Sequence, residues 1–107
     1  MRRETSWRIW RPVPVDDGAG GQTVTMVDVG SERGDVRQLS GRELIEAQQA
    51  GAEHTHSCYF RARADVGRND ELRRGEATLL VLTVTPTFPE GPQGRLRVTA
   101  RSIEGGG

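Results

Sequence analysis

The amino-terminal part of the chain alternates between apolar and polar residues with the period of a β-strand. Within residues 5–15, Trp7 and Ile9 share one parity with Val13 and Val15, which is the pattern of a strand that buries one face. The prolines of this stretch indicate an edge strand or a fraying end, because proline cannot donate a ladder hydrogen bond.

Two further segments favour strands before the middle of the chain. Residues 22–29 are rich in β-branched side chains and predict a second strand, and residues 35–39 predict a short third one. The GSERG sequence at 30–34 is expected to break or bulge the chain between them. The DDGAGG sequence at 16–21 predicts a turn or flexible loop.

A short helix is predicted to start at Ser40. Ser40 and Glu43 have the spacing of a capping box, in which each residue caps the backbone of the other. Gly51 is a plausible stop. Such a helix is marginal alone, so we expect it to dock on something. The residues that share its inner face are Leu44, Ala47 and Gln48.

The carboxy-terminal half predicts three more strands. They cover residues 53–64, 77–88 and 95–103, with a polar connection at 65–76 and a turn at 89–94. The run at 77–88 is apolar on both faces and is expected to be central in a sheet. The residues expected to face inward are Cys58, Phe60, Ala62 and Ala64 in the first of these strands and Leu96, Val98 and Ala100 in the last.

Together these elements predict a mainly β protein. We expect a small antiparallel β-barrel or sandwich of about six strands, with one short α-helix inserted between strands three and four. The length of 107 residues fits a single domain spanning 1–107, with a loop at 16–21 and a flexible tail at 104–107. Apolar residues make up only 34% of the chain, so the core should be thin.

Charge and cysteine content exclude several classes of protein. The 15 basic residues, all arginine, balance 15 acidic ones, whereas a free-standing nucleic-acid binder usually has a basic excess. Arginine is enriched at interfaces, although a GC-rich genome also explains this usage. One cysteine allows no disulfide within the chain. We expect neither a signal peptide nor a membrane span, and therefore a soluble protein without a membrane partner.

No enzyme motif is found. His54 and His56 share a strand face and, with Glu53 or Cys58, could begin a zinc site. A zinc site needs three or four protein ligands, so a place at the edge of the core is the preferred interpretation. Cys58 lies on the parity assigned to the core, where thiols are mostly inert. The acidic pairs are adjacent in loops, and GAGG lacks the Lys-Ser/Thr of a phosphate loop. We predict no catalytic residue, no metal and no cofactor.

Arginines recur on the predicted outer faces of two strands. If those strands are neighbours, they form a stripe with Thr and Tyr interleaved. It could meet phosphates, acidic patches on a neighbouring subunit, or only solvent. The residues of this stripe are Arg61, Arg63, Arg95, Arg97 and Arg101.

The middle of the sequence, VRQLSGRELIEAQQAGAEHTHSCYFRARADV at 36–66, resembles the bacteriophage head–tail joining family, also called head-closure or stopper proteins. The family pattern is a strand ending in Leu-Ser-Gly-Arg-Glu, a helix with Ala-x-Gln, and a Thr-His entering a strand that finishes in Arg. Gln38 and Met26 depart from it, at places where proline and tryptophan are common. The matching residues are Leu39, Ser40, Gly41, Arg42, Glu43, Ala47, Gln48, Thr55, His56 and Arg61.

The resemblance implies a structural part of the head–tail connector of a tailed phage or prophage. Such proteins form a ring, often six- or twelve-fold, beneath the portal or its adaptor. They close the DNA channel and offer a platform to tail-terminator or tail-tube proteins. The implied location is the head–tail interface of the virion, after assembly in the host cytoplasm, with incidental contact to packaged double-stranded DNA.

We interpret residues 40–52 as a docking or gating segment, with plugging of one barrel end by the helix as the alternative. Two other functions compete: a nucleic-acid-binding β-barrel that uses the arginine stripe and stacks bases on Trp7, Trp10 and Tyr59, and a zinc-dependent enzyme. The residues assigned to the docking segment are Ser40, Arg42, Glu43, Leu44 and Gln48.

Overall fold

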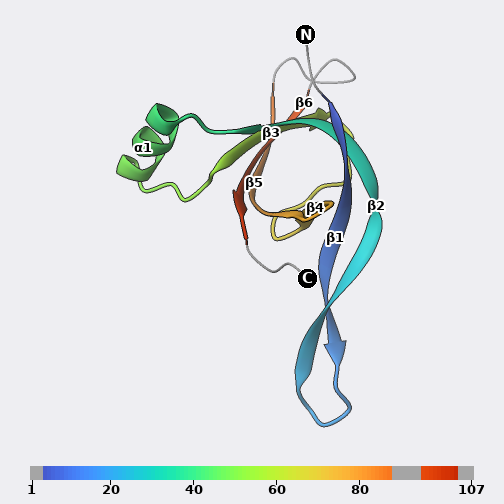
Figure 1. The fold of residues 1–107 in the computed structure, drawn as a ribbon. Helices are drawn as coiled ribbons and strands as arrows, with labels where there is room; N and C mark the ends of the chain where they lie inside the picture. The colour runs from blue at the N-terminus through green and yellow to red at the C-terminus, as the bar shows by residue number, and fades with distance from the viewer. Residues whose placement is uncertain (1–3, 88–94, 104–107) are drawn as a thin grey trace.

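The computed structural model describes residues 4–87 and 95–103, and its strands close into a barrel. In chain order the elements are β1 (Thr5–Asp16), β2 (Gln22–Gln38), α1 (Gly41–Gln49), β3 (His56–Arg61), β4 (Glu71–Arg74), β5 (Ala77–Pro86) and β6 (Arg95–Ser102). The six strands of this described part pair antiparallel in the closed order β1-β2-β3-β6-β5-β4 (Figure 1). The predicted barrel with one helix is confirmed, and the sandwich alternative is wrong. The turn at 89–94 and the tail at 104–107 lie outside the described residues.

Strand β2 corrects the prediction of two separate strands at 22–29 and 35–39. It runs for 17 residues through both segments. Gly30 has a φ of +128°, which glycine adopts at little cost. The register with β1 shifts between Ile9 and Trp10, as at a β-bulge. The GSERG sequence therefore bends the strand without ending it.

Strand β4 lies inside the predicted polar connection at 65–76 and was missed. Only Leu72 of its four residues is apolar, and this side chain is fully buried. A single apolar residue cannot form the alternating pattern by which a strand is predicted. The strand count stays at six because two expected strands merged and one was added. The helix consequently follows the second strand of the chain, not the third.

The barrel encloses one hydrophobic cluster, and the predicted inward parity is largely correct. Cys58, Phe60, Val98 and Ala100 are all buried, as their alternation indicated, while Leu96 is half-buried. The buried apolar residues of the cluster are Trp7, Ile9, Cys58, Phe60, Ala64, Val66, Leu72, Leu79, Val81, Val98 and Ala100.

The β1–β2 hairpin is longer than the barrel and projects from it (Figure 1). β1 pairs with β4 only from Arg8 to Trp10, and β2 pairs with β3 only from residue 34 onward. Residues 12–27, which we call the arm, therefore pair only within the β1–β2 hairpin in the described structure. Val13 and Val15 are exposed, contrary to the buried parity assigned to them, because the strands have by then left the barrel.

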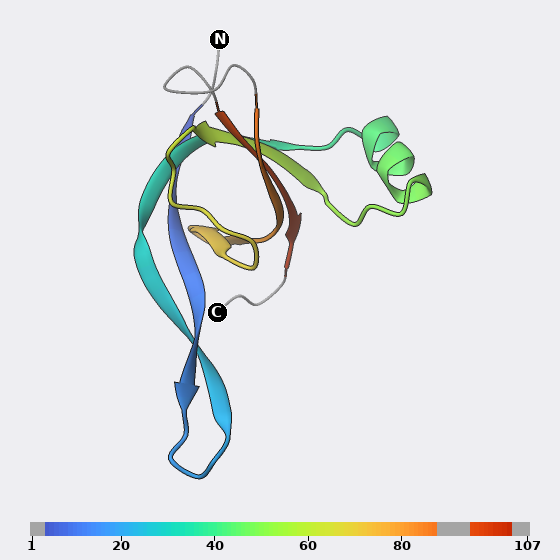
Figure 2. The ribbon, with the colours of Figure 1, turned by 180° about the vertical axis from the view of Figure 1, so that it is seen from behind.

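Helix α1 stands to one side of the barrel (Figures 1 and 2). The capping box is confirmed: the Glu43 backbone N–H donates to Ser40 Oγ at 3.3 Å, and the Ser40 N–H donates to Glu43 Oε1 at 3.0 Å. No residue of the helix is buried, so the expected docking does not occur within the described chain, and the helix does not plug a barrel end. No described helix is long and apolar enough to cross a membrane.

Two charged clusters hold the 62–70 loop against the barrel. The buried carboxylate of Asp70 accepts both Arg11 Nε, at 3.0 Å, and Arg11 Nη2, at 2.8 Å. Arg11 Nη2 also reaches Asp65 at 2.8 Å. The Asp65 backbone N–H donates to Glu32, which in turn binds Arg61. The loop that connects β3 to β4 is thus held by ion pairs as well as by the burial of Ala64 and Val66 in the core.

Candidate interaction surface

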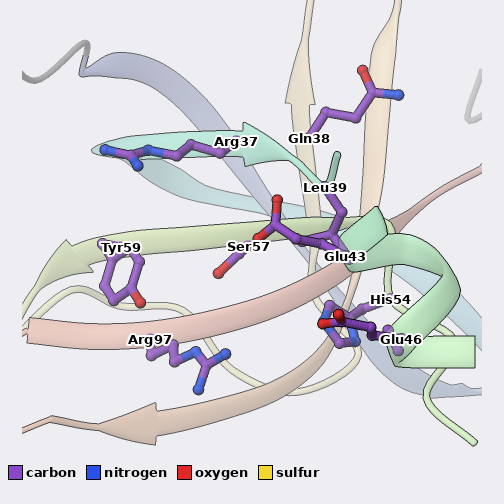
Figure 3. A pocket seen from close by; sticks show the side chains of 10 residues that line it. Arg37, Gln38, Leu39, Glu43, Glu46, His54, Ser57, Tyr59 and Arg97 are labelled. Carbon is purple, nitrogen blue, oxygen red and sulfur yellow. The ribbon is translucent and has the colours of Figure 1, made fainter. Parts of the chain in front are cut away.

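A groove of about 510 Å³ separates helix α1 from the barrel. Its helix side carries the carboxylates Glu43 and Glu46, and its barrel side carries Arg37, Tyr59 and Arg97 (Figure 3). The groove is polar and open, so it does not have the enclosed apolar lining of a typical small-molecule site. Its ten lining residues are Arg37, Gln38, Leu39, Glu43, Glu46, Ala47, His54, Ser57, Tyr59 and Arg97.

The predicted docking segment divides into residues that shape the helix and residues that present a surface. Hydrogen bonds from Ser40 lower the pKa of Glu43, with a smaller contribution from the nearby charge of Arg37, so the carboxylate remains an ionised cap. Arg42 Nε lies 3.3 Å from Glu46 Oε1, and both side chains are well exposed. Of the remaining two, Leu44 is half-buried and Gln48 is exposed.

The structure brings part of the predicted arginine stripe together. Strands β3 and β6 are neighbours, with Arg61 opposite Arg95 and Tyr59 opposite Arg97. Arg101 continues the outer face of β6, but four residues from Arg97, or roughly 13 Å along a strand. Arg63 falls in the turn after β3 and is not on the strand.

Ion pairs reduce the number of arginines in this stripe that carry an unbalanced charge. Arg61 is neutralised by Glu32, with Nε–Oε1 and Nη2–Oε2 distances of 3.0 and 3.2 Å. Arg37, which the stripe omitted, joins the same outer face from β2, where it pairs opposite Ser57. The alternation of residues 35–37 could have predicted this position of Arg37. Val36 is paired with the buried Cys58, so the next residue, Arg37, must face outward.

A smaller hollow of about 230 Å³ lies beside the groove and is lined by Asp35, Arg37, Tyr59 and Arg95. Asp35 is only 7% exposed and accepts Arg37 Nε at 3.3 Å and Nη2 at 3.0 Å. Three residues from three adjacent strands, Arg37, Tyr59 and Arg95, thus lie around the buried carboxylate of Asp35. This arrangement leaves the outer face of β2, β3 and β6 positively charged but structurally fixed.

His56 and Cys58, two of the residues considered for a zinc site, are partly or fully buried in the barrel wall. His56 Nδ1 lies 2.9 Å from Thr55 Oγ1, and burial lowers the pKa of His56. Cys58 is fully buried, and burial is the main cause that raises its pKa to about 12, so the thiol stays protonated at neutral pH. In the residues that the structure describes, no three His, Cys, Asp or Glu side chains are grouped as metal ligands.

Two of the three aromatic residues proposed for base stacking make contacts within the barrel. Trp7 is 7% exposed in the core, and its Nε1 donates to Thr5 Oγ1 at 2.7 Å. One face of Trp10 is covered by Arg73, whose Cζ lies 4.5 Å from the ring centroid. Tyr59 alone opens into the groove. The assignment of Trp7 to a nucleic-acid platform was therefore wrong, and Trp10 has one ring face occupied by Arg73.

Comparison with known proteins gives related folds and a family. The solution structure of a protein from Shigella flexneri 2a aligns with a TM-score of 0.69 at 20% identity, over 91% of this chain and 89% of that one. A chain from the virion of a native gene transfer agent particle aligns with a TM-score of 0.58 at 20% identity, over 96% and 98%. No curated protein sequence matches significantly. The family described as phage head completion protein matches residues 4–100. The chain therefore belongs to the phage head completion protein family, a family of structural proteins of the phage head.

Proposed function

We propose that the protein is a ring-forming component of the head–tail connector of a tailed phage or prophage. It sits beneath the portal or its adaptor, closes the DNA channel and presents a platform to tail-terminator or tail-tube proteins. One observation carries the proposal: a barrel of this size extends two elements, the arm and α1, in which no side chain is buried by the described chain.

The helix supports the docking part of the proposal. Ile45 is 56% exposed, and Arg42 and Gln48 are exposed beside it. Because the capping box fixes the first turn without help from the barrel, the helix is already formed before any partner binds. We expect Ser40 and Glu43 to act by stabilising the helix, and Arg42, Leu44 and Gln48 to contact the adaptor or a sister subunit.

The outer arginines support incidental contact with DNA better than a dedicated binding module. A DNA-binding module needs a basic excess and aromatic platforms, whereas this chain has zero net charge and keeps Trp7 in its core. Arg101 stays exposed and is available to a phosphate backbone that passes through a ring. Assembly would take place in the host cytoplasm, and the mature location would be the virion neck.

Complementation of a gene deletion tests the proposal. Without the protein, heads should fill with DNA but remain tailless, and electron micrographs should show necks without the corresponding ring. Ile45→Glu should fail to restore infectious particles although the variant melts like the wild type. Arg74→Glu, a substitution at an exposed residue of β4, serves as the control and should complement fully. Normal tailed particles in the deletion strain would reject the proposed function.

A further inference from the structure

The arm exposes apolar side chains that a solvated hairpin does not need. An isolated two-stranded ribbon is at best marginally stable in water, and in this one four valines occupy exposed positions. Single exposed apolar residues are ordinary, but here they occupy both strands of one projecting element. The valines and their exposed fractions are Val13 36%, Val15 43%, Val24 67% and Val27 41%.

The charge of the arm has one sign. Residues 12–27 contain Asp16 and Asp17 and no basic residue. Both carboxylates form the turn: Asp16 Oδ1 accepts from the Gly18 N–H at 2.9 Å, and Asp17 Oδ1 accepts from the Ala19 N–H at 2.8 Å. Each carboxylate is exposed at the end of the arm. The arm therefore offers apolar flanks and a fixed, doubly negative tip.

A complementary surface exists on the same molecule. On the outer face of β3 and β6, Arg95 and Arg97 lie around Tyr59, and Arg37 adds a third guanidinium from β2. Among the described residues, no acidic side chain forms an ion pair with Arg97. Arginine beside an accessible tyrosine is the composition of an interface centre.

The tip cannot reach this surface within one chain. The groove that Arg97 and Tyr59 line lies next to α1, and both views place α1 and the arm on different sides of the barrel (Figures 1 and 2). A contact between two different patches of identical chains is heterologous, and it generates a ring when the rotation closes. The contact requires a second copy.

We propose that the acidic tip of the arm in one copy docks on the Arg97–Tyr59 surface of the next copy, with the valines of the arm covered by the neighbouring barrel. The occupant is a sister subunit because the same chain supplies both charges. This inference rests on the proposed ring and names the two patches that build it.

Charge reversal at the two patches tests the inference with the full chain. Asp16→Arg/Asp17→Arg reverses the tip, and Arg97→Glu reverses the face. Each variant alone should weaken self-association at low salt about ten-fold or more, which is the low end of couplings between interfacial charge pairs. Arg74→Glu is the control and should self-associate like the wild type. Thermal melts that match the wild type confirm that the variants fold.

Mixing the variants distinguishes a head-to-tail contact from any other. Each variant alone has no complementary junction, but their mixture has two: the acidic tip of the face variant meets the basic face of the tip variant, and the basic tip of the tip variant meets the acidic face of the face variant. Sedimentation of the 1:1 mixture should therefore show restored self-association that neither variant shows alone. A chain that carries both reversals should regain self-association, because its basic tip meets an acidic face. Dimers of the tip variant alone, a wild type that stays monomeric at millimolar concentration, or loss of DNA binding as the only defect of Arg97→Glu would each overturn the inference.

The proposed function is judged by a separate readout. If the chain is found in virion necks while the tip and face variants assemble like the wild type, the inference fails and the proposed function stands. If the variants lose self-association but the chain is missing from particles, the proposed function fails and the interface stands.

Discussion

Replacing Arg11 by methionine should destabilise the barrel, because it leaves the carboxylate of Asp70 without its counter-ion. Asp70 is 1% exposed and accepts two hydrogen bonds from Arg11, at 3.0 and 2.8 Å. Removing one partner of a buried pair typically costs about 3–5 kcal/mol. The Gly67 N–H at 2.8 Å remains as a donor, and the Arg11 side chain is itself 33% exposed. We therefore expect the low end, about 3 kcal/mol.

Urea unfolding measures this loss as a shift of the midpoint at constant slope. Arg42→Met provides the matched control, because it removes an arginine from the exposed Arg42–Glu46 pair. Exposed pairs of this kind contribute only about 0.3–0.5 kcal/mol. The reasoning is refuted if the two variants lose equal stability, or if Arg11→Met loses less than about 1 kcal/mol, the scale of an ordinary hydrogen bond.

Three further variants probe other parts of the fold. Gly34→Ala places a Cβ 2.5 Å from the Phe60 ring and should cost about 1–3 kcal/mol in urea unfolding, as overpacking does; an unchanged midpoint would contradict this close approach. Ser40→Ala should lower helical circular dichroism with a local cost of about 1 kcal/mol, yet leave the cooperative unfolding midpoint in place. Glu32→Gln tests pH dependence. Burial alone would raise the pKa of Glu32, but the hydrogen bonds from Arg61 and from the Asp65 backbone N–H outweigh burial, so the net pKa lies below the ordinary 4.5. The ionised form therefore stabilises the wild type above pH 4.5, and acid titration should show that this advantage over Glu32→Gln disappears as pH falls through the lowered pKa.

Alternation predicted the interior well wherever strands stay inside the barrel. Cys58 and Phe60 are buried as their parity required, and so is Val98 in the paired strand. Val13 has the same kind of parity and is exposed. A strand pattern reports which face a residue occupies, but it does not report where the neighbouring strands end. The length of the hairpin beyond the barrel is therefore invisible in the sequence.

Local chemistry was predicted better than tertiary position. The Ser40 capping box formed because both of its partners lie within four residues of each other. The sequence at Gly30 is compatible with either a break or a bulge in the strand. Only the pairing of β2 with β1 distinguishes the two. The contribution of Arg37 to the arginine surface likewise depends on β2 lying beside β3, which no short motif encodes.

The placement of ion pairs separates the parts that hold the fold from the parts that face outward. The pairs of Asp70 and Glu32 are largely buried on their acidic side, with side-chain exposures of 1% and 10%, whereas the Arg42–Glu46 pair on α1 is exposed by 90% and 63%. Buried partners make a pair costly to break, and exposed pairs contribute little. Substitutions on the outer surface of α1 or at the tip of the arm should therefore change assembly far more than the stability of the monomer. Substitutions in the Arg11–Asp70 or Arg61–Glu32 pairs should do the reverse: they should lower the stability of the monomer, while the molecules that stay folded keep both projecting elements unchanged.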